Sequence, residues 1–446
     1  MSDAVPFRIE VPEADIVELK QRLQNTRAPP RFDDSAREKW SYGVDSETLT
    51  NALEYWEKEF DWKKAEAELN TFSNYKANVS GLGIHFIHER SSSPDALPLL
   101  LIHGWPGSVW EFHKIIPMLT KPDENGQAFH VIAPSLPGYG WSEAPREAGY
   151  GVSEAADTFN QLMMELGYDS YVAQAGDWGA MVTKMIGVRY PNNCVGLHLN
   201  MPHSAANMEV SLRNTVLLSR MLGSIIAPTL LLEADEISNF DRTFNYLRTD
   251  SGYMLTHSTK PNTLGWGLAD SPAGLCAWIL EKCHSWTDQD LSFDEVLTNI
   301  SIYWFTKTIS SSCRFYYESI AIVPGVKDHY EEINRYCNVP TALALFPKEI
   351  IASPRSWAKL CYNLKQYNVM EKGGHFAAWE EPELLNEDVR TFYFKTTNFT
   401  ELVEEAKTRE VDQGLSMFSV FEKDPKGASV VAGIAAWMAY KVASKL

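Results

Sequence analysis

The organisation of this chain follows from one segment, Tyr171-Val-Ala-Gln-Ala-Gly176-Asp177-Trp178-Gly179-Ala180-Met181-Val182. An apolar run ends in small residues, turns at Asp177 and continues with the residue spacing of a helix. This pattern predicts a buried strand that leads into a helix through a sharp, strained turn, at which one side chain is exposed. The alanines and glycines on either side of Asp177 have the small size that such a crowded turn requires.

The residue expected at the tip of the turn is an aspartate, and this indicates a particular chemistry. A carboxylate that attacks an electrophilic sp3 carbon forms an alkyl ester, which water can cleave at the carboxyl carbon. A serine that attacked the same carbon would form an ether, and the reaction would stop there. Asp177 therefore points to epoxide opening or to displacement of a halogen from carbon. The alternative interpretation is an N-cap aspartate at an ordinary helix start.

Composition and charge narrow the class of protein. The chain has 446 residues, enough for one large domain with insertions or for two domains. Its formal net charge of -18 disfavours binding to a nucleic acid backbone. The cysteines are scattered without C-x-x-C pairs, which predicts reduced thiols rather than a disulfide framework or a zinc site. They are Cys194, Cys276, Cys283, Cys313, Cys337 and Cys361.

Of the two ends of the chain, only the C-terminal end resembles a known localisation signal. The N-terminus has no apolar segment typical of a secretory signal. The longest apolar segment, Ala428–Tyr440, is shorter than the roughly 20 residues that a membrane-spanning helix needs. The last residues, Ser444-Lys445-Leu446, have the form of a peroxisomal address that an import receptor reads. We therefore expect a peroxisomal protein, or otherwise a cytoplasmic one; a role in detoxification or secondary metabolism would suit that address.

Residues 1–95 are predicted to form a wrapping region ahead of the main sheet. Apolar spacing predicts helices over Val11–Leu23 and over Glu47–Phe60, the second capped by Ser46. Alternating apolar residues over Phe72–Glu89, interrupted by a Gly-rich turn, predict a hairpin.

Residues 96–200 are predicted to form the first part of an α/β core with a mostly parallel sheet. The continuous apolar run Leu97–Ile102 is typical of a buried parallel strand. The loop His103-Gly-Trp-Pro-Gly-Ser108 and a predicted helix Val109–Leu119 follow it. A Gly-rich loop between a strand and a helix is a place from which a backbone amide can stabilise an oxyanion. Strand signals at Phe129–Ala133 and at Cys194–Asn200 alternate with helices, which favours a doubly wound sheet.

The alternation stops after residue 200, and residues 201–338 are predicted to form a helical lid. The sheet is expected to resume in residues 339–400, with a strand ending before Glu349 and a helix over Ser356–Leu364. His375 follows on a Gly-Gly loop. These residues complete the chain order nucleophile, acid, histidine, although Glu349 and His375 could also be ordinary loop residues. Residues 401–446 are predicted to be a tail.

That chain order is the order of the α/β-hydrolase fold. The sequence resembles a microsomal-type epoxide hydrolase of fungal type over about Pro6–Phe394. The resemblance is carried by these motifs: His103-Gly-Trp-Pro106, Gly176-Asp-Trp-Gly179, Thr259-Lys-Pro, Asp270-Ser-Pro, Arg314-Phe-Tyr316, Phe346-Pro-Lys-Glu349 and Gly373-Gly-His375. Family members often carry an N-terminal membrane anchor, which this chain lacks, and this favours a soluble enzyme.

The resemblance implies an epoxide hydrolase with an orienting acid at Glu349 and two lid tyrosines. These map to Tyr253 and Tyr316, although Tyr317 could replace Tyr316 in that assignment. The expected reaction begins with attack of Asp177 on an epoxide ring carbon while the tyrosines bind its oxygen.

In the second step His375 activates water. The backbone amides of Trp105 and Trp178 are expected to hold the oxyanion that forms on Asp177. The reaction needs no metal or organic cofactor, and the expected partner is a small apolar epoxide.

Two other functions stay open from the sequence. A haloalkane dehalogenase also uses an aspartate followed by tryptophan, and the amide of Trp178 would suit a halide. The lid discriminates between the two, because a halide needs N–H donors whereas an epoxide oxygen needs an O–H. A non-catalytic binding protein of the same fold would be expected to lose a member of the triad. Homodimer formation is also open.

Overall fold

The computed structural model describes residues 4–30, 37–204, 223–225, 230, 232–320, 322–327 and 329–409. Within these residues nine strands form one sheet, in the order β1-β2-β3-β5-β4-β6-β7-β8-β9. The strands are β1 (Val5–Pro6), β2 (Asn74–Val79), β3 (Leu82–Glu89), β4 (Leu97–Ile102), β5 (Phe129–Pro134), β6 (Tyr171–Ala175), β7 (Cys194–Leu199), β8 (Cys337–Leu345) and β9 (Tyr362–Val369).

The helices fall into groups along the chain. The first group is α1 (Glu13–Gln24), α2 (Ser46–Lys58) and α3 (Trp62–Leu69). The second is η1 (Val109–Phe112), α4 (Ile115–Thr120), α5 (Val152–Glu165) and α6 (Asp177–Arg189). The third is α10 (Ala234–Thr249), α11 (Gly252–Thr259), α12 (Pro261–Asp270), α13 (Pro272–Ser285), α14 (Phe293–Thr306), α15 (Ile309–Ser319) and α16 (Tyr330–Ile333). The last is α17 (Arg355–Cys361), α18 (Ala377–Glu380), α19 (Pro382–Thr391), η2 (Phe392–Thr396) and α20 (Phe399–Ala406).

The sheet is mostly parallel, as expected. Strands β5, β4, β6, β7, β8 and β9 pair in parallel, whereas β1, β2 and β3 pair in antiparallel fashion and join the sheet through β5. The predicted hairpin over Phe72–Glu89 is thus β2 and β3, and it extends the same sheet.

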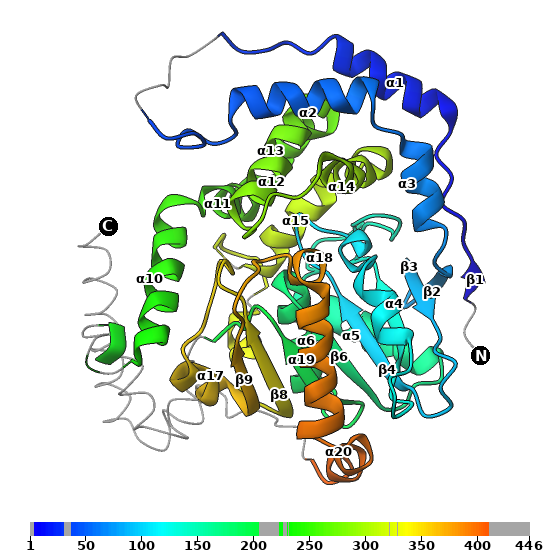
Figure 1. Cartoon of the computed structure of the whole chain (residues 1–446), viewed down its shortest axis with the longest axis vertical. Helices are drawn as coiled ribbons and strands as arrows, with labels where there is room; N and C mark the ends of the chain where they lie inside the picture. Colours follow the sequence, from blue (N-terminus) through cyan, green and yellow to red (C-terminus); the bar gives the residue numbers. More distant parts are fainter. Residues whose placement is uncertain are drawn as a thin grey trace.

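Both faces of the sheet are buried. Along β4, Leu100 and Ile102 join the core beneath α5 and α6, whereas Leu99 and Leu101 join the core on the side of α4 and α19. This two-residue alternation follows from strand geometry, and burial on both faces explains why β4 is apolar throughout. Because these strands are parallel, they end together at one edge, below helices α11–α15 (Figure 1).

The N-terminal helices lie across the third group, which forms a cap over this edge (Figure 1). Trp56 of α2 donates from Nε1 to Ser301 Oγ of α14 at 3.0 Å. Arg22 of α1 forms an ion pair with Asp270 of α12 at 3.0 Å. The first contact is buried and the second is exposed, and together they join the wrapping region to the cap rather than to the sheet alone.

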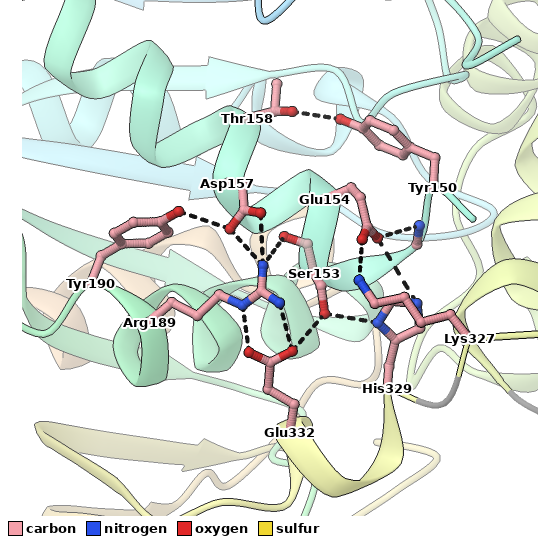
Figure 2. A network of polar contacts seen from close by, with 11 residues as sticks. Tyr150, Ser153, Glu154, Asp157, Thr158, Arg189, Tyr190, Lys327, His329 and Glu332 are labelled. Carbon is pink, nitrogen blue, oxygen red and sulfur yellow. Dashed lines mark hydrogen bonds and ion pairs between the residues drawn. The ribbon is translucent and has the colours of Figure 1, made fainter. Parts of the chain in front are cut away.

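A polar network joins the end of the cap to the core helices (Figure 2). Arg189 of α6 lies between Asp157 of α5, at 2.7 Å, and Glu332 of α16, at 2.6 Å. Ser153 Oγ lies 2.7 Å from Nδ1 of His329. Charge-assisted bonds on both sides of one guanidinium fix its geometry. The segment that returns from the cap to β8 is thereby tied to α5 and α6.

Three local expectations were wrong in detail. The cap of α2 is Asp45, whose carboxylate accepts from the Thr48 amide at 2.8 Å, rather than Ser46. The helix expected over Val109–Leu119 is divided into η1 and α4. The helix expected over Ser356–Leu364 ends at Cys361, because pairing with β8 draws the following residues into β9. Tertiary pairing overrode helix propensity there.

Some of the predictions concern the C-terminal end of the chain. Ala428–Tyr440 and the signal Ser444-Lys445-Leu446 lie outside the described residues, so the address stays a prediction. The boundary drawn at residue 400 falls within α20, whose Leu402 is buried against the core, so the core continues into the predicted tail. Within the described part of the chain, no helix combines the length and the apolar character needed to cross a membrane.

Candidate active site

Asp177 lies at the turn between β6 and α6, as the sequence predicted. Its φ angle is +45°, in the left-handed region that side chains other than glycine rarely adopt. Such strain persists only where the surrounding structure holds it, and it is common at active sites. The side chain is almost completely buried, with 9% of the residue exposed.

The small residues around Asp177 are required by close packing. A Cβ atom on Gly179 would lie 2.2 Å from the Ile102 carbonyl oxygen, and one on Gly176 would lie 2.6 Å from the Asn200 side chain. A Cβ atom on Gly104 would lie 2.2 Å from Asp177 Oδ1. The turn can therefore pack against Ile102 and Asn200, and the backbone at Gly104 can approach the carboxylate, only because these positions have no side chain.

Asp177, His375 and Glu349 meet although they are far apart in sequence. His375 Nε2 lies 3.4 Å from Asp177 Oδ2, and its Nδ1 lies 2.6 Å from Glu349 Oε1. Because a carboxylate can only accept, Nδ1 carries a proton and donates the hydrogen bond to Glu349. Glu349 is fully buried and also accepts from the Ile350 amide at 2.8 Å. The arrangement leaves Nε2 facing the nucleophile, which is the geometry of a triad.

The two predicted oxyanion donors have different positions. The Trp105 amide donates to Asp177 Oδ1 at 2.7 Å. This contact holds one carboxylate oxygen and leaves Oδ2 as the oxygen available for attack. The Trp178 amide belongs to the first turn of α6, where backbone N–H groups have no acceptor within the helix. The Trp178 amide is therefore available to donate to an oxyanion, and its role as an oxyanion donor stays a prediction.

The two predicted lid tyrosines pack against the tryptophans that flank the nucleophile. The ring of Tyr253, from α11, stacks on Trp105 at a centroid distance of 5.1 Å. The ring of Tyr316, from α15, contacts Trp178 edge-on at 4.7 Å and lies 6.0 Å from that of Tyr253. Tyr316 is buried, whereas its neighbour Tyr317 is partly exposed. Tyr316 is thus the phenol that faces the tryptophan beside Asp177.

Comparison with known proteins agrees with this geometry. Residues 4–112 match the family model described as epoxide hydrolase N terminus, and residues 98–382 match that of the alpha/beta hydrolase fold. A putative epoxide hydrolase of Stigmatella aurantiaca is 41% identical over 86% of this chain and 83% of its own length. The chain belongs to the epoxide hydrolase family. The fold and the enzyme class expected from the sequence are therefore confirmed.

Two further relatives of this epoxide hydrolase come from animals. Epoxide hydrolase 1 of Sus scrofa is 40% identical, over 87% of this chain and 88% of its own. The crystal structure of juvenile hormone epoxide hydrolase from the silkworm Bombyx mori superposes with a TM-score of 0.79 at 32% identity. It covers 91% of this chain and 95% of the silkworm chain. The similarity thus extends over the wrapping region, the core and the cap.

Electrostatics sets the protonation of the candidate groups. Burial alone would lower the pKa of His375, but the charges of Glu349 and Asp177 raise it well above its usual value. Burial raises the pKa of Tyr253 and of Tyr316 well above the usual value for a phenol, and the Asp177 charge adds to this in both. Both phenols therefore keep their protons and remain O–H donors.

The structure adds residues that sequence patterns did not suggest. Tyr246 of α10 shares a 2.9 Å hydrogen bond with the Tyr253 hydroxyl. Asn299 of α14 donates to the Pro106 carbonyl at 2.7 Å, and Tyr303 donates to the Gly107 carbonyl at 2.7 Å. The cap thus holds the loop that carries Trp105. A polar residue on a mostly apolar helix was the only sequence signal for Asn299.

The loop that carries His375 is also held from the cap. The backbone N–H of His375 donates to the Trp286 carbonyl at 2.9 Å, and the Trp286 ring contacts the imidazole at a centroid distance of 5.0 Å.

Among the described residues, no group of three or more His, Cys, Asp or Glu side chains could hold a metal ion. All six cysteines are buried, and none of them is joined to another by a disulfide bond.

Proposed function

We propose that Asp177 is the nucleophile with which this enzyme hydrolyses epoxides to vicinal diols, with His375 and Glu349 as the base and its orienting acid. The observation that carries these roles is the contact of Asp177 with both the Trp105 amide and His375. One carboxylate oxygen is held by an oxyanion donor, and the other faces the imidazole. This arrangement supports formation of an ester and then its hydrolysis.

In the first half-reaction Asp177 Oδ2 attacks a ring carbon of the epoxide, and the ring carbon–oxygen bond breaks. Tyr253 or Tyr316 gives its proton to the departing oxygen, which becomes the hydroxyl of an alkyl ester. Deeply buried phenols suit this role, because they remain protonated until a stronger base is formed beside them. Without a proton, the alkoxide would be a poor leaving group.

In the second half-reaction water attacks the carboxyl carbon of the Asp177 ester. Alkylation removes the negative charge of Asp177, and with it one of the interactions that raise the pKa of His375. As its pKa falls, the imidazolium gives its extra proton to the phenolate that the first half-reaction left. The neutral imidazole then takes a proton from water and returns it to the departing alcohol oxygen, so that the diol leaves. The Trp105 amide holds the oxyanion on Oδ1. The proton left on the new Asp177 carboxyl passes to His375, which restores the charge of both groups.

The cap favours an epoxide over a haloalkane as substrate. A halide leaves as a stable anion and needs N–H donors, whereas an epoxide oxygen needs a proton donor. Two phenols, Tyr253 of α11 and Tyr316 of α15, contact the tryptophans beside Asp177. The complete triad disfavours a non-catalytic binding role. A small apolar epoxide is the substrate class that aromatic surroundings of this kind suit.

The purified enzyme should convert styrene oxide to its diol and release no bromide from butyl bromide. Product analysis by chromatography and a bromide assay measure the two activities under the same conditions. Diol formation that depends on Asp177 supports the assignment. Bromide release at a comparable rate, or the absence of diol, would contradict it.

Removal of the phenol hydroxyls should slow alkylation selectively. Each of Tyr253→Phe and Tyr316→Phe is expected to lower the alkylation rate by about 10- to 100-fold, and the double variant by about 10⁴-fold. The matched control is Tyr317→Phe, on the same helix as Tyr316, which should stay within about 3-fold of wild type. Single-turnover quenching measures the rate. A double variant as fast as either single variant would show that only one phenol acts.

A further inference from the structure

A third buried carboxyl group, that of Glu111, lies beside the triad. Glu111 belongs to η1, which directly follows the loop that carries Trp105, and 9% of the residue is exposed. A cavity of about 20 Å³ is lined by Glu111, Asp177 and His375, together with Trp105. The two half-reactions described above use Asp177 and His375 but leave Glu111 without a role.

The position of Glu111 is fixed from both sides. A Cβ atom on Gly107 would lie 1.3 Å from Glu111 Oε1, so the carboxyl group occupies the space that a side chain at residue 107 would need. Ser108 Oγ accepts from the Trp110 amide at 3.2 Å and donates to Asn299 of the cap at 2.8 Å. The turn that carries Glu111 is thus held by the cap as well as by the core.

The size and lining of the cavity suit one water molecule. A site for water needs at least about 10–15 Å³ and two to four polar partners. The cavity of about 20 Å³ meets the first condition, and the polar groups of Glu111, His375 and Asp177 meet the second. The cavity is too small for the alkyl group of a substrate. Substrate is therefore excluded from the side of the Asp177 carboxylate on which the cavity lies.

The protonation state of Glu111 is compatible with a water site next to the triad. Burial raises the pKa of Glu111 to about 8; the His375 charge opposes this, while Asp177 and Glu349 add to it. At neutral pH the group is therefore mostly neutral and adds no third negative charge to the site. A carboxyl group offers an acceptor oxygen to a water hydrogen in either protonation state.

We propose that Glu111 positions the water that hydrolyses the Asp177 ester. Its carboxyl oxygen accepts one hydrogen of the water while His375 accepts the other, so that a lone pair points at the carboxyl carbon of Asp177. Glu111 exchanges no proton in this step. The proposal rests on the proposed function, because water enters the reaction only after the ester has formed.

The test separates the two half-reactions in Glu111→Ala and Glu111→Gln. Excess enzyme is mixed with styrene oxide, and ester formation and decay are followed by intact-mass analysis of quenched samples. Glu111→Ala should alkylate within about 3-fold of the wild-type rate and hydrolyse the ester about 10- to 100-fold more slowly, since misplacement by about 1 Å costs this much. Glu111→Gln retains an acceptor oxygen, and its hydrolysis should return to within about 10-fold of wild type.

Controls distinguish positioning from a loss of stability. Glu66 is also a buried glutamate, but it bonds the Val11 amide in the wrapping region. Glu66→Ala should lower stability and leave the ratio of the two rates unchanged. If Glu111→Ala does not fold, Glu111→Asp replaces it, because the shorter side chain withdraws the acceptor and should slow hydrolysis alone.

The outcomes are decisive for each proposal separately. Hydrolysis that is unchanged in Glu111→Ala, that falls together with alkylation, or that is as slow in Glu111→Gln as in Glu111→Ala overturns the role of Glu111. The ester would still form in wild type under those outcomes, so the proposed function would stand. If no ester forms in the wild type or in any of the variants, His375→Gln included, the proposed function is overturned instead.

Discussion

Asp177→Ala is expected to lower kcat for epoxide hydrolysis by at least about 10⁴-fold, since it removes the group that forms the covalent intermediate. Among the described residues, Asp177 is the carboxylate that the Trp105 amide holds at the turn and that faces His375, so we expect no other of these carboxylates to replace it. The residual rate should equal that of spontaneous hydrolysis in the same buffer. Steady-state diol formation is the measurement.

The matched control is Asp15→Ala, which makes the same substitution at an exposed position on α1. It should leave kcat within about 2-fold of wild type. Both variants should give the circular dichroism spectrum of the wild type. Retention of more than about 1% of wild-type turnover in Asp177→Ala would show that another group opens the epoxide.

His375→Gln is expected to separate the half-reactions. Alkylation needs Asp177 and the phenols, so its rate should stay within about 10-fold of wild type. Ester hydrolysis loses its general base and should slow by about 10³-fold. The alkyl-enzyme should therefore accumulate to nearly one equivalent after substrate is added, and intact-mass analysis measures it directly.

His130→Gln is the control for this prediction, because His130 lies near the start of β5, at the opposite end of the sheet from Asp177. It should show no accumulation. If His375→Gln turns over without an ester, or loses alkylation as fully as hydrolysis, then His375 is not the base that activates water. Glu349 Oε1 lies 2.6 Å from His375 Nδ1 and orients the imidazole as a base, so we do not expect turnover without an accumulated ester.

The sequence was sufficient for the parts of the site that depend on local chemistry. The turn at Asp177 could be recognised because a strand, a tight turn and a helix each leave a pattern within a few residues. The loop of Trp105 and the Gly-Gly loop of His375 could be recognised for the same reason. Their common location followed from the rule that parallel strands end at one edge of a sheet.

The residues that the sequence did not reveal act through tertiary contacts. Glu111 is one polar residue in an apolar stretch, and only its burial against Gly107 distinguishes it from a solvated glutamate. Asn299 and Tyr246 likewise depend on which helices pack together in the cap. The lid tyrosines were assigned from family resemblance, since no spacing rule links Tyr253 to Tyr316. Asp45 was missed as the N-cap residue of α2 because Ser46, next to it, is an equally good N-cap residue.

The covalent ester of Asp177 is tested most directly by one turnover in heavy-oxygen water. Excess enzyme is mixed with styrene oxide, the diol is isolated, and a peptide that contains Asp177 is analysed by mass spectrometry. The diol of this first turnover should contain only light oxygen, and one heavy oxygen should appear in the Asp177 carboxylate. Heavy oxygen in the first diol, with an unlabelled Asp177, would mean that water attacks the epoxide directly and would contradict the account.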